Sequence, residues 1–233
     1  MERESGLSIL GSSGWLAGTP PEFRKRFLSA ARWCHVDPGT TLTLGGEEKD
    51  NVIGLAHGTV ALTSTLGRAG NPVMHMAHAV LWIGYGPLLL ERPRDVTAEA
   101  RTDLWIAVIP KAKILPLLDE STLWWRCFMR LLAEYGDTSA MVASDLLIRQ
   151  SDRRLAATIL RFAGLRGLSS GLMEPVRLPI TQAELAEAAN LSRNATGTIL
   201  RKLAAKGYLE IDYRGVVVHD PAGLQKFVAE VPV

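Results

Sequence analysis

The sequence predicts an α+β protein with three parts: an N-terminal antiparallel β-roll or jelly roll over residues 1–120, a long dimerisation helix over 121–150, and a C-terminal winged helix-turn-helix over 151–233. Three observations carry this prediction. Short apolar runs separated by glycine-containing turns fill residues 34–110, as in antiparallel barrels. One amphipathic helical pattern then extends to about residue 150. Two capped helical segments and a hairpin pattern occupy residues 180–219.

The composition is that of an ordinary globular protein, with 47% hydrophobic and 21% charged residues. The two cysteines, Cys34 and Cys127, lie far apart, and neither belongs to a CxxC or Cys/His spacing. This argues against a disulfide framework, a zinc site or an iron–sulfur cluster. The N-terminus lacks the apolar segment of a signal peptide, and no apolar run reaches membrane-spanning length. We therefore expect a cytoplasmic protein without membrane attachment.

The N-terminal half predicts a short helix and then a series of strands. Residues 1–13 are polar and rich in glycine and serine, so we expect a loose leader there. Pro20 and Pro21 mark the start of a short amphipathic helix over residues 22–28. Turn-forming residues then separate seven runs whose length and apolar content predict β-strands. These runs cover residues 41–44, 51–56, 59–64, 73–77, 81–83, 95–100 and 105–109.

Three histidines lie within the predicted β-roll, so a metal-dependent enzyme of the cupin type is an alternative interpretation. Such enzymes place two histidines two residues apart, on the same face of a strand. His75 and His78 are three apart and would point to opposite faces, while His57 stands alone. No glutamate lies at ligand spacing. We therefore expect neither a metal site nor catalytic residues in this region.

The long helical pattern over 121–150 predicts pairing with a second copy of the chain. About thirty residues would span roughly 45 Å, which is longer than packing on a small barrel requires. Apolar residues recur at alternating spacings of three and four, as in the seam of a two-helix coiled coil. The alternative is a helix that lies along its own domain. The expected interface residues are Trp125, Phe128, Leu132, Tyr135, Val142 and Leu146, with Ser139 interrupting the seam.

Residues 180–207 predict two short helices joined by a tight turn. Thr181 and Glu184 have the spacing of a capping box, which starts the first helix. Asn190 in the turn tolerates a left-handed backbone, and Ser192 caps the second helix. Ile199 is expected to face inward from that second helix.

The outward face of the second helix is suited to an anion. No Asp or Glu occurs from residue 191 to 207, and residues 151–233 carry 11 Lys and Arg against 8 Asp and Glu. A helix N-terminus attracts phosphate, and arginine and asparagine match the edges of guanine and adenine. The alternative is an ordinary helical hairpin with a solvated basic face. The residues expected to contact DNA are Thr181, Gln182, Ser192, Arg193, Asn194, Thr196, Thr198, Arg201 and Lys202, with Arg214 in a hairpin wing.

The whole chain resembles the CRP/FNR family of bacterial transcription regulators. The resemblance rests on Ser192-Arg193 and Ile199-Leu200 in the second helix, on 153–156 after the long helix, and on 57–60 and 84–94 in the β-roll. It implies a homodimeric regulator that reads a near-palindromic site in double-stranded DNA, and RNA polymerase is the further partner that it implies. It does not imply an enzyme.

The chain departs from the cassette with which members of this family bind cyclic nucleotides. That cassette has Gly-Glu near its start and Arg-Ser or Arg-Thr near its end, whereas here Tyr85 follows Gly84 and Asp95 follows Arg94. Tyrosine supplies no carboxylate for the ribose, and aspartate would repel the phosphate. We expect no binding of cyclic AMP in the family's manner. These four residues and Ser139 are candidates for the pocket of an unknown small effector, if one exists.

The other cofactors of the family are not expected either. Cys34 is alone near the N-terminus, so an iron–sulfur cluster lacks ligands, and only His75 or His78 could serve as a haem ligand. In the recognition helix, Asn194 replaces a glutamate and Thr198 replaces an arginine of the family pattern, so the preferred half-site should differ at one or two positions. A regulator that acts through protein contacts, with a β-roll that senses nothing, remains an alternative.

Overall fold

A computed structural model describes residues 3–47, 50–64, 72–166 and 175–230 of the chain. The fold is α+β, with an antiparallel β-roll, a long helix and a helix-turn-helix followed by a hairpin wing, as the sequence predicts. The chain divides into two compact units, Met1–Ala69 with His78–Ser139, and Gly70–Ala77 with Ala140–Val233. Within the described ranges, no helix is both long and apolar enough to cross a membrane.

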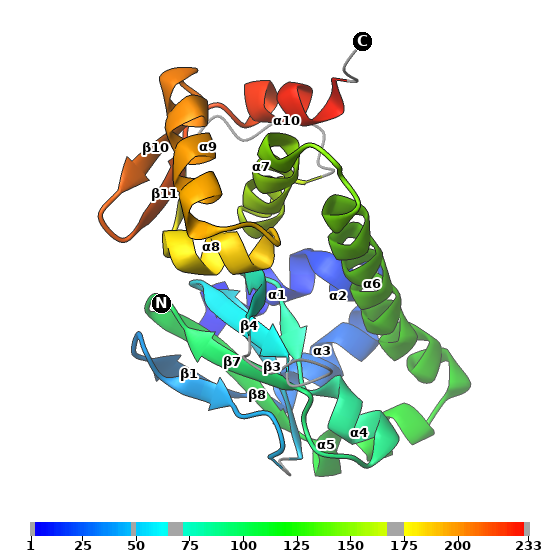
Figure 1. Cartoon of the computed structure of the whole chain (residues 1–233). Helices are drawn as coiled ribbons and strands as arrows, with labels where there is room; N and C mark the ends of the chain where they lie inside the picture. The colour runs from blue at the N-terminus through cyan, green and yellow to red at the C-terminus, as the bar shows by residue number, and fades with distance from the viewer. Residues whose placement is uncertain (1–2, 48–49, 65–71, 167–174, 231–233) are drawn as a thin grey trace. The chain divides into compact units, whose positions relative to one another are not determined.

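The β-roll of the first unit consists of two antiparallel sheets that face a common apolar interior (Figure 1). One sheet has the order β1 (Arg32–Val36), β8 (Leu104–Pro110), β3 (Asn51–His57) and β6 (Trp82–Ile83). In the other, β2 (Thr41–Thr43), β7 (Val96–Ala100) and β4 (Val60–Ser64) lie side by side. Buried residues of both sheets, among them Leu55, Leu62 and Ile106, fill the interior.

The strands lie where the turn pattern predicts them, with two exceptions. β1 was not expected, because its side chains are exposed or half-buried and its sequence shows no apolar alternation. A short helix, α4 (Tyr85–Leu90), replaces the turn expected after residue 84. It begins after Gly84, whose φ of 98° lies in the left-handed region that glycine favours.

The N-terminus is helical, which corrects the expectation of a loose leader. α1 (Arg3–Ser12), α2 (Gly14–Ala17) and α3 (Pro21–Ser29) follow one another. Leu10 and Trp15 are almost fully buried, and Gly6 lies so close to the Trp33 ring that a Cβ would collide with it. The glycine that made this segment look like a leader is therefore what allows the helix to pack closely.

α5 (Lys111–Asp119) leads into α6 (Thr122–Leu146), which buries one of its faces in the first unit. Phe128 has no exposed surface, and its ring meets Trp15 edge to face at 5.7 Å between centroids. The Tyr135 hydroxyl donates to the carbonyl oxygen of Trp82. The Trp125 indole donates to Asp119 at 3.2 Å. Three of the predicted interface positions therefore have partners within their own unit.

A different face of α6 is exposed, and it consists of apolar and small residues. Met129 is 53% exposed and Leu147, just after the helix, is 80% exposed. The intervening positions follow spacings of three and four, which place them on one face. They are Ala133, Gly136, Ala140 and Ala143, all exposed. A Cβ added at Gly136 would meet nothing within 4 Å, consistent with an open surface there.

The second unit is built on α7 (Ser151–Phe162) and a small sheet. α8 (Gln182–Ala188), α9 (Arg193–Ala205) and α10 (Pro221–Ala229) surround α7, and β5 (Val73–Ala77) packs against α7 and α8. The sheet has the order β10 (Leu209–Asp212), β11 (Gly215–Val218) and β9 (Val176–Leu178). Figure 1 shows the β10–β11 hairpin beside α9.

A buried ion pair joins the last turn of α6 to α7 in the second unit. The Asp145 carboxylate is fully buried and accepts from Arg161 at 3.2 Å and from Arg166 at 3.0 Å. Burial lowers the pKa of Arg161, while the charge of Asp145 opposes that shift. Arg161 also donates to the carbonyl oxygen of Met74 at 2.9 Å. Because each buried charge depends on its partner, this cluster holds the two helices in one arrangement.

Candidate nucleic-acid interface

The turn between α8 and α9 is held by caps at both helices. The Thr181 hydroxyl accepts from the Glu184 backbone amide at 3.2 Å, and the Glu184 carboxylate accepts from the Thr181 amide at 2.8 Å, which completes the predicted capping box. Asn190 has a φ of 52°, the left-handed conformation expected of it. The Ser192 hydroxyl accepts from the Ala195 amide at 3.2 Å and starts α9.

Arg154 on α7 also stabilises this turn, by hydrogen bonds to backbone carbonyl oxygens. The sequence does not reveal this role. Its Nε donates to the carbonyl oxygen of Ala189 at 2.7 Å, and its Nη1 donates to that of Ile148 at 2.7 Å. Ala189 is fully buried, so its carbonyl oxygen would otherwise lack water as a partner. Arg154 lies in the matched segment 153–156, but no local pattern shows which distant carbonyl groups a guanidinium will reach.

The exposed face of α9 carries most of the predicted contact residues. Arg193, Asn194, Thr198 and Arg201 are exposed, and Gln182 is exposed at the start of α8. Thr196 is the exception, because it has no exposed surface. It lies three residues before Ile199, on the inner face of α9, and cannot contact DNA. The prediction treated it as polar and overlooked its helical position.

Two lysines near the end of α9 have partners within their own unit. Lys202 Nζ lies 2.9 Å from the Asp152 carboxylate. Burial alone would raise the pKa of Asp152, but the hydrogen bond and charge of Lys202, with backbone amides, hold that pKa below its usual range. Lys206 Nζ lies 4.8 Å from the centroid of the Phe227 ring. Lys202 and Lys206 are exposed, but both side chains contact partners of their own unit rather than pointing away from α9 beside Asn194 and Arg201.

The wing presents an aromatic residue and a cation at its tip. Tyr213 is 92% exposed, and the Arg214 guanidinium lies 5.8 Å from the centroid of its ring. An ion pair between Arg177 and Asp212 joins β9 to the hairpin close to this tip. Arg214 was predicted as a contact residue. Tyr213 was not, since an exposed aromatic residue in a turn has no distinctive sequence pattern.

Arg94, one of the predicted effector residues, has hydrogen-bond partners within its own unit. Arg94 is 3% exposed, and its Nη2 donates to the backbone carbonyl of Asn51 at 2.9 Å and to its side-chain oxygen at 2.8 Å. Gly84 makes this possible, because a Cβ there would lie 2.7 Å from Arg94 Nη1. Burial lowers the pKa of Arg94. The guanidinium is thus directed at β3 of its own unit.

The remaining effector candidates lie on or near α4 and α6. The Tyr85 ring packs against Tyr135 with centroids 4.7 Å apart, and burial raises the pKa of Tyr85. Asp95 forms an ion pair with Arg92 at 2.6 Å. Ser139 is exposed, one turn beyond Tyr135. Gly84 therefore lies next to Arg94, and Tyr85 packs against Tyr135. Ser139 lies on the exposed part of α6.

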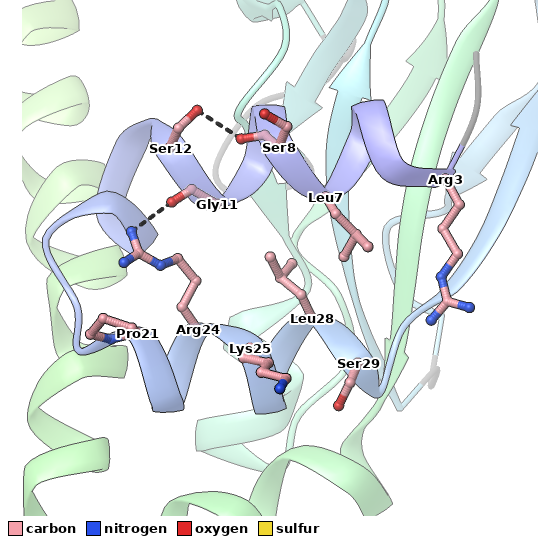
Figure 2. Close-up of a pocket in the computed structure, with 10 residues that line it drawn as sticks. All are labelled: Arg3, Leu7, Ser8, Gly11, Ser12, Pro21, Arg24, Lys25, Leu28 and Ser29. Carbon is pink, nitrogen blue, oxygen red and sulfur yellow. Dashed lines mark hydrogen bonds between the residues drawn. The ribbon is translucent and has the colours of Figure 1, made fainter.

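A groove of about 550 Å³ opens elsewhere in the first unit, between α1 and α3 (Figure 2). Leu7 and Leu28 supply apolar surface, and Arg24 donates across it to the carbonyl oxygen of Gly11 at 2.8 Å. None of the predicted effector residues lines it.

Among the described residues, one group of potential metal ligands occurs, formed by His35, Asp37 and Asp103. All three side chains are exposed, and none of the histidines of the sequence analysis, His57, His75 and His78, belongs to this group.

Comparison with known proteins identifies both units. Residues 33–121 match the family model of the cyclic nucleotide-binding domain, and residues 153–227 match that of the Crp-like helix-turn-helix domain. No curated protein sequence matches the chain.

Several solved structures share the fold. A protein from Ruegeria pomeroyi, assigned to the cyclic nucleotide-binding proteins, is 21% identical over 99% of this chain and 100% of its own, with a TM-score of 0.69. The c-di-GMP-responsive regulator CLP of Xanthomonas campestris is 20% identical over 86% and 99%, with a TM-score of 0.64. A CRP/FNR-family regulator from Thermus thermophilus is 21% identical over 85% and 99%, with a TM-score of 0.62.

The left-handed turn residue provides a test of this local geometry. Replacing Asn190 with alanine should lower the free energy of unfolding by about 1 kcal/mol, because a Cβ without a compensating polar group is strained at positive φ. Asn190→Gly should cost little, since glycine adopts this conformation readily. Urea denaturation of both variants checks the difference. Equal stability of the two variants would contradict a strained turn at this position.

Proposed function

Because this chain is a transcription regulator of the CRP/FNR family, we propose that it acts in the cytoplasm as a homodimer that binds a near-palindromic DNA site. α9 of each copy would enter the major groove, and the two helices would lie about one helical turn of DNA apart. RNA polymerase would be the protein partner. The CRP/FNR family consists of regulators and not of enzymes, which agrees with this role.

The exposed face of α9 is the observation that carries the proposal. It presents Arg193, Asn194 and Arg201 without a carboxylate in the helix, and its N-terminus is fixed by the Ser192 cap. The positive end of the helix dipole at this N-terminus favours phosphate. Arginine pairs best with guanine and asparagine with adenine, so Arg193 and Asn194 would read adjacent bases. Thr181, Gln182 and Arg214 would contact the DNA backbone.

The exposed face of α6 supports the dimer. Met129, Ala133, Gly136, Ala140 and Ala143 form an apolar stripe that pairing with a second α6 would remove from water. The small residues at its centre would allow the two helices to approach closely. Each position lies one residue later than a position of the predicted seam. Leu132, Val142 and Leu146 would lie at the border of this interface.

The cassette residues support a regulator that does not respond to cyclic AMP. The Arg94 guanidinium is buried and bonded to Asn51, and the neighbouring Asp95 carries a negative charge. A cyclic phosphate would have to displace the first contact and lie close to the second, at an electrostatic cost. Iron–sulfur and haem cofactors remain unexpected. The alternative of a regulator that works through protein contacts, without any ligand, is favoured by the same observation.

Selection of bound sequences from a random duplex pool, with no ligand added, tests the proposal directly. We expect an inverted repeat. Arg193→Ala should weaken binding to the selected site by about 1–3 kcal/mol and make one base pair degenerate, because a bidentate contact is lost. Lys226→Ala, which removes an exposed cation of α10, is the matched control and should leave the selected site unchanged. Equal losses on selected and random DNA for Arg193→Ala would contradict its role.

The dimer is tested by placing a charge in the exposed stripe. Ala140→Arg should shift the protein from dimer to monomer in sedimentation velocity, because two guanidinium groups would meet in an apolar interface. Ala140→Ser changes the size of the same side chain only slightly and should remain dimeric. A monomeric native protein at micromolar concentration, or a dimeric Ala140→Arg variant, would exclude pairing through this face.

Isothermal titration calorimetry tests the independence from cyclic AMP. We expect no stoichiometric heat of binding when cyclic AMP is added to the native protein. Asp95→Ser removes the repelling charge and serves as the comparison variant. Tight, stoichiometric binding by the native protein would overturn this part of the proposal and assign the effector role to the cassette.

A further inference from the structure

The guanidinium of Arg201 does not extend freely from α9 but lies back along the helix. Its Nη2 donates to the Thr198 hydroxyl at 3.3 Å. Its Nη1 lies 3.6 Å from the point where a Cβ of Gly197 would stand. Long side chains on a helix lean toward its N-terminus, so a residue at 201 covers the surface of the preceding turn. Arg201 therefore occupies the surface above Gly197 and Thr198.

Gly197 leaves this surface flat enough for a second side chain to reach it. The Gln182 side-chain oxygen, from the first residue of α8, lies 3.4 Å from the same Cβ point. The Gln182 amide and the Arg201 guanidinium thus both approach Gly197, which is itself buried, and the Thr198 hydroxyl bonded to Arg201 is exposed beside it. Arginine holds five donors in a rigid fork, and the Thr198 contact uses only one nitrogen. The other donors remain available.

The direction of Arg201 distinguishes it from the lysines of the same helix. Asn194, Thr198 and Arg201 follow spacings of four and three, so they form one stripe along the exposed face. Lys202 lies off this stripe and is paired with Asp152. Arg201 is therefore the cation that shares a stripe with Asn194, the residue expected at the bases, whereas Lys202 is placed for the backbone.

We propose that Arg201 is a base-reading residue and that Thr198 positions it. With α9 in the major groove, the fork would donate to the O6 and N7 atoms of a guanine, beyond the base pair read by Asn194. The Thr198 hydroxyl restricts the rotamers of Arg201 before binding, which reduces the entropy lost when the contact forms. This inference rests on the proposed function, because it requires that α9 enters the major groove.

The rival role for Arg201 is a contact to a phosphate, and the two roles respond differently to lysine. A phosphate contact depends on charge, which lysine keeps. A guanine contact depends on the planar fork, which lysine lacks. Arg201→Lys is therefore the decisive variant, and Thr198→Val, which removes the hydroxyl at nearly constant volume, tests the positioning role. Lys202→Ala is the control for a contact that carries no sequence information.

The experiment repeats the selection from a random duplex pool with each full-length variant and measures affinity for the native site and for random DNA. Arg201→Lys should weaken binding to the native site about tenfold to a hundredfold, leave random DNA nearly unchanged and make one base pair degenerate. Thr198→Val should relax the same base pair to a smaller extent. The double variant should lose less than the two single losses combined, since both act on one contact.

Each outcome has one meaning. A native sequence preference that survives Arg201→Lys overturns the inference and leaves the proposed function in place. Arg201→Ala, which removes the charge altogether, is measured in the same way, and equal losses on both DNAs for this variant assign a phosphate contact instead. Relaxation of different base pairs by the two variants would show that Thr198 reads independently and does not position Arg201. A native protein that enriches no sequence with or without cell extract would refute the proposed function itself.

Discussion

One guanidinium, that of Arg154, holds the part of the molecule on which DNA reading depends. It donates to the carbonyl oxygens of Ala189 in the turn between α8 and α9 and of Ile148 just beyond α6. An unpaired buried carbonyl group costs about 1–3 kcal/mol, and the loss of this side chain would leave the carbonyl group of the buried Ala189 without this partner. The capping box at Thr181 and the left-handed Asn190 then fix the direction in which α9 leaves the turn. The direction of α9, and with it the orientation of its exposed face, thus depends on bonds made at the turn that precedes the helix.

Two of the candidate effector residues, Arg94 and Tyr85, contact other residues of the first unit. Arg94 is buried against Asn51, and Tyr85 packs on Tyr135, whose hydroxyl is bonded to the backbone of Trp82. Buried polar groups of this kind stabilise a fold when every donor finds an acceptor. They also attach the N-terminal half of α6 firmly to the roll. A domain built in this way has less need of a ligand to order the contact between roll and helix, which agrees with the proposed independence from cyclic AMP.

α6 illustrates how one apolar pattern can serve two purposes. Phe128 and Tyr135 pack within the first unit, whereas Met129, Gly136, Ala140 and Ala143 are exposed. The predicted seam includes Phe128 and Tyr135 of the packed face, because a heptad pattern assigns the largest apolar residues to the interface. In this helix the largest residues belong to the core of their own unit. The small residues, which attract little notice in a sequence, form the face that is free for a second copy.

The sequence alone determined the succession of β-roll, long helix and helix-turn-helix, the caps at Thr181 and Ser192, the left-handed Asn190 and the family to which the chain belongs. The caps and the left-handed turn depend on neighbours within a few residues, whose preferences are local and strong. Contacts between distant segments were decided only by the tertiary structure. These include Arg154 against the turn, Gly6 against Trp33, and Arg94 against Asn51. A long side chain can reach many partners, and packing alone selects which one it meets.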